Sequence, residues 1–191
     1  MNLDKYKIPM KELSSSLKES IAREIQYFEF LGFEHANKIH KENKFSIGIC
    51  RDSKGSALVK CITEMPQVTP KMIDWWFGWH ITDSERYKLW HPRDHISSKL
   101  KLDTSDLKTD KDKYIHIDSY VTEYIGKELN NLCISFVDPK EFGFFKLDPE
   151  NETAICAHVK DLNRNISIGS LTHHVLKTTT GSIMQSSFWL G

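Results

Sequence analysis

The sequence predicts an α+β domain in which a helical N-terminal part precedes a curved antiparallel sheet. Two observations carry this prediction. Apolar residues recur at steps of three and four in the first part of the chain, whereas later apolar residues gather in short runs separated by turn residues. Helices that come before a run of strands at hairpin spacing are typical of α+β folds.

A helical arm, residues 1–44, is the first predicted element. Its apolar positions follow the helical repeat at Leu13, Leu17, Ile21, Ile25, Phe28 and Leu31. The helix is predicted over residues 10–43, with a possible break at Gly32. We expect this arm to serve packing or oligomerisation rather than to carry a functional site.

Residues 45–191 form the second predicted unit. The turn Asp52-Ser53-Lys54-Gly55 joins two strands as a hairpin, with Gly55 at a position that needs a positive φ. Thr69 and Pro70 open a helix as its N-cap and first residue. The predicted strands are residues 45–50, 57–64, 114–125, 131–137, 153–159, 166–177 and 182–190, and residues 99–113 form a polar surface loop.

The composition excludes several classes of partner. The 191 residues carry 26 Lys and Arg against 26 Asp and Glu, so the chain offers no basic field for phosphates and nucleic acid is not expected. Apolar stretches stay far below the roughly 18 residues of a membrane span, and residues 1–10 hold no apolar signal core. We therefore expect a cytoplasmic protein without a membrane partner. Four cysteines stand singly in apolar runs and predict buried thiols: Cys50, Cys61, Cys133 and Cys156.

The segment from Trp75 to His95 holds the densest chemistry. Four of its residues are tryptophans: Trp75, Trp76, Trp79 and Trp90. Side chains of this size line either a core or a large apolar cavity. Core packing is the simpler interpretation for Trp75 and Trp76.

Two histidines at the end of this segment, His91 and His95, lie four positions apart. On a helix this spacing would place them on one face, which leaves a paired-histidine metal site open. Pro92 argues against the helix, because the residue before a proline is disfavoured in the α region. We therefore expect His91 at a cap or turn and His95 as the freer side chain.

An acid lies on an apolar strand face. The odd positions from Ile115 to Ile125 form that face at period two, and Glu123 is one of them. A carboxylate in an apolar setting costs several kcal/mol unless it is paired, hydrogen-bonded or bound to a metal. Glu123 therefore either lies near the wet end of the strand or has a partner inside a cavity.

A second histidine pair, His173 and His174, lies within a predicted strand. Neighbours on a strand point to opposite faces, so one of the two can face a cavity. The alternation of this strand is weak, and we prefer His174.

Four strings stand out in the second unit: Met65-Pro66, Trp75-Trp76-Phe77-Gly78-Trp79-His80, Arg86-Tyr87-Lys88-Leu89-Trp90-His91-Pro92 followed by His95, and Ser187-Phe188-Trp189-Leu190-Gly191. Together they resemble the diacetylphloroglucinol hydrolase family, from about Lys60 to the last residue. The resemblance implies a helix-grip sheet like that of plant-allergen and lipid-transfer domains, and a helical N-terminal part that aids formation of a homodimer. It also implies zinc-dependent hydrolysis of the carbon–carbon bond between an acyl group and a phenolic ring.

The resemblance also assigns roles to residues. His95 and Glu123 match ligands of Zn²⁺, and Tyr87 and His174 match catalytic pocket residues, with His173 as the alternative to His174. Substrate binding would fall to Trp75, Trp79, Trp90 and His91. The family's remaining ligands, a histidine and a glutamate four apart on a C-terminal helix, have no match here, so we expect residues 45–191 to be a C-terminally truncated unit with half of the metal shell.

Two classes of function follow. The leading hypothesis is a zinc-dependent hydrolase of acylphloroglucinol-like aromatic ketones, whose activity is in question because half of the metal shell is missing. The alternative is a non-catalytic helix-grip module that binds a hydrophobic or phenolic small molecule. A third interpretation is a poorly folding remnant, since a sheet without its gripping helix exposes an apolar face.

Overall fold

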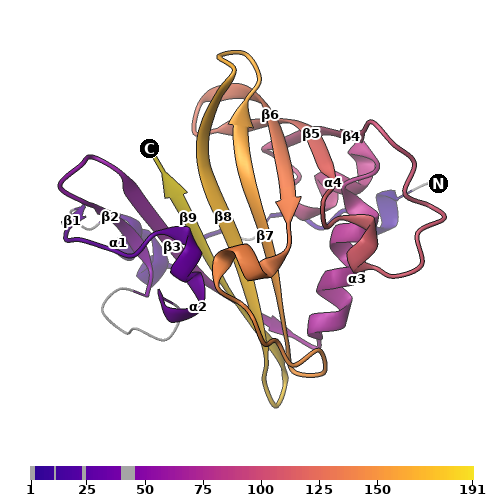
Figure 1. The fold of residues 1–191 in the computed structure, drawn as a ribbon, viewed down its shortest axis with the longest axis horizontal. Helices are drawn as coiled ribbons and strands as arrows, with labels where there is room; N and C mark the ends of the chain where they lie inside the picture. The colour runs from indigo at the N-terminus through magenta and orange to yellow at the C-terminus, as the bar shows by residue number, and fades with distance from the viewer. Residues whose placement is uncertain (1–2, 11, 23–24, 40–45) are drawn as a thin grey trace.

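The computed structural model describes residues 3–10, 12–22, 25–39 and 46–191. Within them, strands assemble into one curved, nine-stranded sheet (Figure 1). In spatial order the strands are β1 (Gln26–Tyr27), β2 (Gly48–Arg51), β3 (Ala57–Pro66), β9 (Gly181–Leu190), β8 (Ile166–Lys177), β7 (Glu152–Asp161), β6 (Glu128–Val137), β5 (Asp118–Ile125) and β4 (His95–Leu100). β1 pairs with β2 in parallel, and the other neighbours are antiparallel. The mixed α+β class with a curved sheet is thus confirmed.

Two helices, α3 (Pro70–His80) and α4 (Ser84–Trp90), pack against one face of the sheet. The Thr69 hydroxyl accepts from the Met72 amide and Pro70 is the first residue of α3, as predicted. Asp83 caps α4 by accepting from two amides of its first turn. A core of side chains from α3 and the sheet fills this layer: Ile73, Phe77, Ile81, Tyr114, Phe136, Ile155, Ala157, Leu171, Val175 and Met184.

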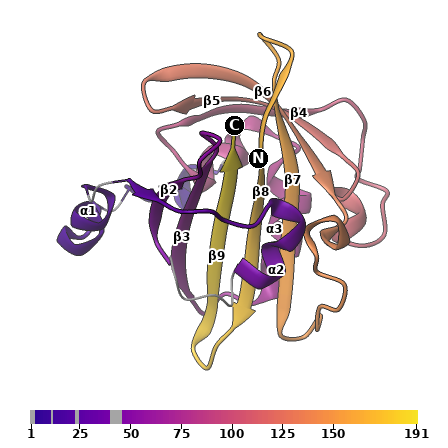
Figure 2. The same cartoon turned by 60° about the vertical axis from the view of Figure 1, so that its left-hand side comes forward.

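The opposite face of the sheet is covered by the N-terminal segment and by the 3-10 helix η4 (Pro139–Phe142), as Figure 2 shows for the segment that crosses β9 and β8. Phe142 is fully buried there, and the Trp189 indole donates to the Leu31 carbonyl at 2.9 Å. Both faces of the central strands are therefore covered, and their residues are buried on both sides.

The N-terminal helix predicted over residues 10–43 is wrong for much of its length. In that range the structure has the short pieces α1 (Ser15–Ala22), β1, η2 (Phe33–His35) and α2 (Ala36–Ile39), preceded by η1 (Asp4–Tyr6), and residues 11, 23–24 and 40–43 lie outside the described part. Phe28 and Phe30 both pack on the core, and this spacing of two belongs to an extended segment. Ile25 and Leu31, expected on the buried helix face, are exposed.

The strands predicted in the second unit are present with shifted ends, and the structure adds β4 and α4, which were not predicted. The hairpin turn between β2 and β3 places Gly55 at φ +91°, and strand residues 166–177 are β8 as predicted. The loop predicted at residues 99–113 covers residues 101–117 and contains η3 (Lys111–Lys113), because residues 99–100 belong to β4 and β5 begins only at Asp118 rather than at residue 114. Of the four cysteines, Cys61 is half-buried and the other three are buried.

A β-bulge interrupts the pairing of β4 with β5. His95 pairs with Glu123, but Ser97 pairs with Thr122, so Ile96 is an extra residue on β4. Because of it, His95 and Ser98 both face the layer of α3 and α4 although three positions separate them.

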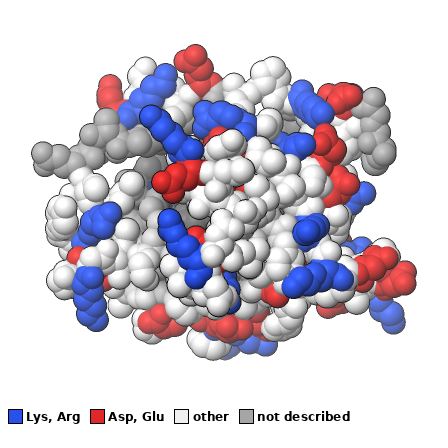
Figure 3. All heavy atoms as spheres, turned by 90° about the horizontal axis from the view of Figure 1, so that it is seen from above, with Lys and Arg blue, Asp and Glu red and all other residues white. Residues whose placement is uncertain are grey.

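One face of the molecule carries both charge signs without segregation (Figure 3). On the face drawn in Figure 3, basic and acidic side chains lie interspersed, in keeping with the zero net charge. In the described residues we find no helix with the length and apolar character that crossing a bilayer requires.

Candidate active site

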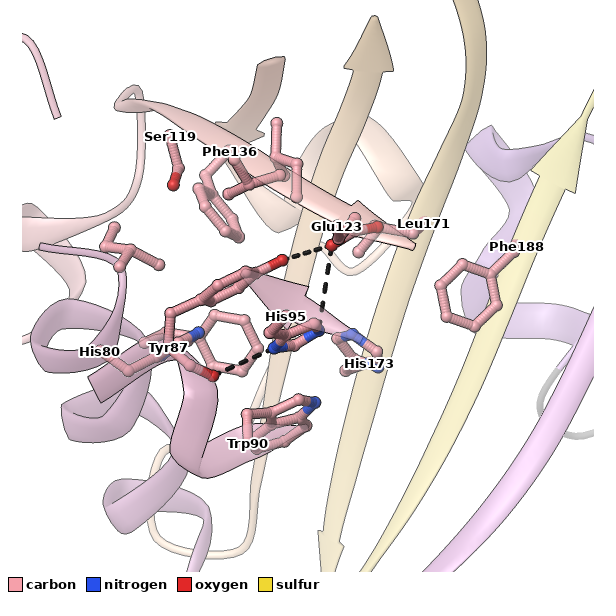
Figure 4. Close-up of a pocket in the computed structure, with 14 residues that line it drawn as sticks. His80, Tyr87, Trp90, His95, Ser119, Glu123, Phe136, Leu171, His173 and Phe188 are labelled. Carbon is pink, nitrogen blue, oxygen red and sulfur yellow. Dashed lines mark hydrogen bonds and ion pairs between the residues drawn. The ribbon is translucent and has the colours of Figure 1, made fainter. Parts of the chain in front are cut away.

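A cavity of about 250 Å³ lies between the sheet and helices α3 and α4 (Figure 4). Its walls are mainly apolar, and its polar residues come from both the sheet and the helices: Ser119 and Glu123 from β5, His95 from β4, His173 from β8, His80 from α3 and Tyr87 from α4. An apolar cavity with a few convergent polar groups is the usual form of a small-molecule site.

His95 and Glu123 face each other inside this cavity. Their strands place them directly opposite, and the imidazole Nε2 lies 3.9 Å from the Glu123 Oε2 atom. Tyr87 completes the group, because its hydroxyl donates to Glu123 Oε2 and its ring stacks on His95 with the ring centroids 3.8 Å apart. The carboxylate suspected from strand alternation therefore has partners inside a cavity.

The hydrogen bonds fix where the protons lie. His95 Nδ1 is 3.0 Å from the Tyr87 carbonyl oxygen, and a carbonyl can only accept, so Nδ1 carries the proton. Burial lowers the pKa of His95 to about 4, so the imidazole is neutral near pH 7. The lone pair of Nε2 then points at the Glu123 carboxylate. Two electron-pair donors thus face each other across 3.9 Å.

Burial also sets the protonation of the neighbouring groups. It raises the pKa of Glu123, which the hydrogen bond from Tyr87 partly offsets. It raises the pKa of Tyr87, with the Glu123 charge acting in the same direction, so this phenol keeps its proton. Among the histidines of the wall, burial lowers the pKa of His80 to about 3 and of His173 to about 4.

The "DAPG hydrolase PhiG domain" family model matches residues 32–191. The chain belongs to this family. Membership was expected from the tryptophan and histidine strings, and it is confirmed.

Individual relatives carry hydrolase names. The chain is 30% identical to "Phloretin hydrolase" of Eubacterium ramulus over 169 residues, which are 83% of this chain and 60% of that protein. It is 29% identical to "2,4-diacetylphloroglucinol hydrolase" of Pseudomonas protegens over 135 residues, 66% of this chain and 43% of that protein. The chain therefore spans about half the length of these relatives. Among solved structures, that of Ara h 8.0201 aligns with a TM-score of 0.41 at 10% identity, over 70% of this chain and 77% of that one.

Within this member of the DAPG hydrolase family, the histidine of β8 that lines the cavity is His173, not His174. His173 contacts Phe77 and Phe188, and its Nδ1 lies 2.7 Å from the Ser186 hydroxyl. His174 points to the other face, where its Nε2 is 2.9 Å from Glu152. The preference for His174 was wrong because both faces of β8 are buried. The alternation of polar and apolar residues therefore does not show which face of the strand points to the cavity.

The tryptophan wall is only partly as predicted. Trp90 lines the cavity, whereas Trp75 and Trp79 stack on each other on the outer face of α3 with centroids 5.3 Å apart. Trp75 is half exposed, and Arg86 lies over the Trp79 ring. Trp75 and Trp79 are four positions apart and therefore share one face of α3, and this face is not the one that packs on the sheet.

His91 lies beside the cavity rather than in its wall. It ends α4 as the C-cap residue, as expected before Pro92, and its ring centroid is 5.6 Å from that of His95. Its Nδ1 accepts from the Asp94 amide at 3.2 Å, which turns it toward the loop. Sequence patterns assign no role to other wall residues, such as His80, Ser119 and Phe188.

Proposed function

We propose that this chain hydrolyses the carbon–carbon bond between an acyl group and a phenolic ring, with Zn²⁺ bound by His95 and Glu123. The observation that carries the proposal is the pair of electron-pair donors directed at each other within an apolar cavity. A cation or a proton between the two groups would stabilise such an arrangement. We further propose that the sheet with its covering helices is a variant of the helix-grip fold.

The donor set fits zinc in type and nearly in distance. Neutral imidazole and carboxylate are common zinc ligands, and two ligands at about 2.0–2.2 Å in a tetrahedral site lie roughly 3.3 Å from each other. The observed 3.9 Å needs only a small adjustment of either side chain. Tyr87 holds both ligands from outside, one through its hydroxyl and one through its carbonyl, as outer partners of metal ligands do.

A third ligand does not come from the described residues, which hold no cluster of three or more His, Cys, Asp or Glu suited to a metal. Catalytic zinc sites usually use three protein ligands and water. Two protein ligands hold the ion more weakly, so we propose a hydrated and exchangeable site in this chain.

The reaction consumes one water and forms a carboxylic acid and a phenol. A bound Zn²⁺ would supply polarisation of the acyl carbonyl and activation of water near pH 7. Water adds to the carbonyl carbon, the bond from that carbon to the ring breaks, and the ring carbon takes up a proton. Hydroxyl groups beside that carbon stabilise the departing electron pair by tautomerisation.

The chain's own residues bind and orient the substrate. Trp90, Phe77 and Phe136 offer flat apolar contacts to a phenolic ring. We propose that His173, in the position first given to His174, orients a substrate oxygen and passes the proton to the ring carbon, held by its contact with Ser186. Tyr87 stays protonated and keeps Glu123 in place.

Metal analysis together with product analysis tests this function. Zinc content would be measured by mass spectrometry, and hydrolysis of phloretin and 2,4-diacetylphloroglucinol by chromatography. We expect zinc and turnover in the unaltered chain and loss of both in His95→Ala and Glu123→Ala. Two exposed residues serve as matched controls, with His116→Asn and Glu128→Ala keeping both properties.

The outcomes separate the hypotheses. Zinc retained in both cavity variants would show that His95 and Glu123 are not its ligands. Quenching of tryptophan fluorescence by either ketone without product formation would favour the binding-module alternative. A homodimer built with the N-terminal segment and a cytoplasmic location remain proposals, which light scattering and cell fractionation would check.

A further inference from the structure

Ser119 lies in the cavity wall away from the His95–Glu123 pair. Both Ser119 and Glu123 belong to the inward face of β5, and Figure 4 shows them apart in the cavity. Four residues of a strand span about 13 Å. Ser119 is 1% exposed, so its hydroxyl must find its hydrogen-bond partners inside the protein or in a ligand.

The direction of the hydrogen bonds at Ser119 follows from its neighbours. The Ser98 hydroxyl donates to the Ile81 carbonyl at 2.7 Å, which uses the single proton of Ser98. The Ser98 and Ser119 hydroxyl oxygens lie 3.1 Å apart, so the proton between them belongs to Ser119. Ser119 therefore donates to Ser98 and keeps lone pairs for a further donor. It offers an acceptor, and not a donor, to the cavity.

The surroundings decide which donor fits. The described residues that line the cavity include no Lys or Arg, and those nearest Ser119 on the neighbouring strand are apolar, with Ile134 directly opposite. A charged ammonium would lose its hydration there without an ion-pair partner, whereas a neutral hydroxyl needs only one acceptor. The spacing along β5, about 13 Å of backbone between Ser119 and Glu123, leaves room for one aromatic ring that reaches both residues with polar groups at opposite ends.

We propose that Ser119 is a specificity-determining residue that accepts a hydrogen bond from a phenolic hydroxyl across the ring from the acyl group. Ser98 is a positioning residue, because it holds the Ser119 proton away from the cavity. The inference rests on the proposed function for the orientation of the ring, with the acyl group at His95 and Glu123.

Binding of three probes tests this inference without any turnover. The probes are 2,4-dihydroxyacetophenone, 2-hydroxy-4-methoxyacetophenone and 2-hydroxyacetophenone, which present a donor, an acceptor only and no group at the far end of the ring. Dissociation constants would be measured by quenching of tryptophan fluorescence, with chromatography to confirm that the probes stay intact. For the unaltered chain we expect the dihydroxy probe to bind about five- to tenfold more tightly than the other two, the range of one net hydrogen bond.

Two variants act in different directions. In Ser119→Ala the advantage of the dihydroxy probe falls below about twofold. In Ser98→Ala the Ser119 proton is free to turn toward the ligand, so the methoxy probe binds at least twofold more tightly than it does to the unaltered chain. Ser135→Ala on the neighbouring strand, whose hydroxyl bonds to Asp118 outside the cavity, is the matched control and keeps all three constants.

The inference is overturned if Ser119→Ala keeps the preference for the dihydroxy probe, or if Ser98→Ala leaves the methoxy probe unchanged. Thermal unfolding of each variant shows whether the fold is intact. A preserved probe preference in a chain that hydrolyses neither ketone would refute the proposed function and leave the role of Ser119 standing. Hydrolysis without any probe preference would do the reverse.

Discussion

Removal of the Tyr114 hydroxyl is expected to destabilise the fold measurably. Tyr114 is 1% exposed, and its hydroxyl donates to Asp74 Oδ1 at 2.8 Å. The Thr153 hydroxyl donates to the same oxygen at 2.7 Å, and the Lys111 ammonium lies 3.8 Å from the other one. This group joins α3, the loop before β5 and β7, and so it anchors the helix that carries Phe77 and His80 of the cavity wall.

The magnitude follows from the geometry. A hydrogen bond to a charged group contributes about 1.5–3 kcal/mol, and since Thr153 still serves the same oxygen we expect a loss of about 2 kcal/mol in Tyr114→Phe. For a chain of this size each kcal/mol lowers the Tm by about 2–4 °C, which gives a decrease of about 4–8 °C. Differential scanning calorimetry at pH 7 measures it. Tyr124→Phe, at a phenol that is 40% exposed, is the control and should shift the Tm by less than 1 °C or so.

A double-mutant cycle sharpens the test. When Thr153→Val is added to Tyr114→Phe, the buried Asp74 oxygen loses both of its donors. The combined loss should exceed the sum of the single losses by more than about 0.5 kcal/mol. Additive losses, or a Tm of Tyr114→Phe equal to that of the control, would refute the view that this carboxylate anchors α3.

Three further predictions concern pH, the metal and the sheet. Burial holds the pKa of folded His173 at about 4, below the ordinary 6.5, so its contribution to stability is complete above pH 6.5 and is lost as the pH falls toward 4. His173→Phe lacks this pH dependence. Between pH 7 and pH 5 its free energy of unfolding in urea should therefore fall by about 2 kcal/mol less than that of the unaltered chain. Tyr87→Phe should weaken zinc binding about 10–100-fold in calorimetric titration, because its hydroxyl no longer orients Glu123. An unchanged affinity would show that this hydroxyl does not support a metal ligand. Gly169→Ala should destabilise the fold by more than about 2 kcal/mol in urea, since the added Cβ would lie 2.2 Å from the Trp189 carbonyl; a smaller loss would mean that β8 and β9 separate easily.

Sequence patterns located the site where one face of an element differs from the other. Glu123 was found because β5 has an exposed and a buried face, so an acid among apolar residues stood out. The strands and the capped helix α3 were predictable for a second reason, because turn and cap residues close by in the sequence determine where they begin and end. The family resemblance then paired His95, already marked by its spacing to His91, with Glu123 and added Tyr87, and the structure brings the three together.

The wrong predictions come from segments whose partners are distant in sequence. The N-terminal segment takes its form from the sheet that it covers, where Phe28 and Phe30 reach the core from an extended chain. His174 was preferred over His173 because alternation carries no information when both faces of a strand are buried. Trp75 and Trp79 were predicted to bind substrate, but they lie on the outer face of α3. Which row of a helix faces the sheet depends on where the sheet lies, and the helical repeat alone does not give that.

One short edge strand, β4, supplies both the imidazole of the His95–Glu123 pair and the Ser98 hydroxyl that contacts Ser119. With Ile96 as an extra residue, His95 and Ser98 face the same side of the sheet. Without Ile96, His95 and Ser98 would lie two positions apart in regular pairing and would still face the cavity, whereas regular pairing with Ile96 retained would turn one of them to solvent. The bulge therefore lets β4 carry one residue more than its partner strand without losing either inward side chain.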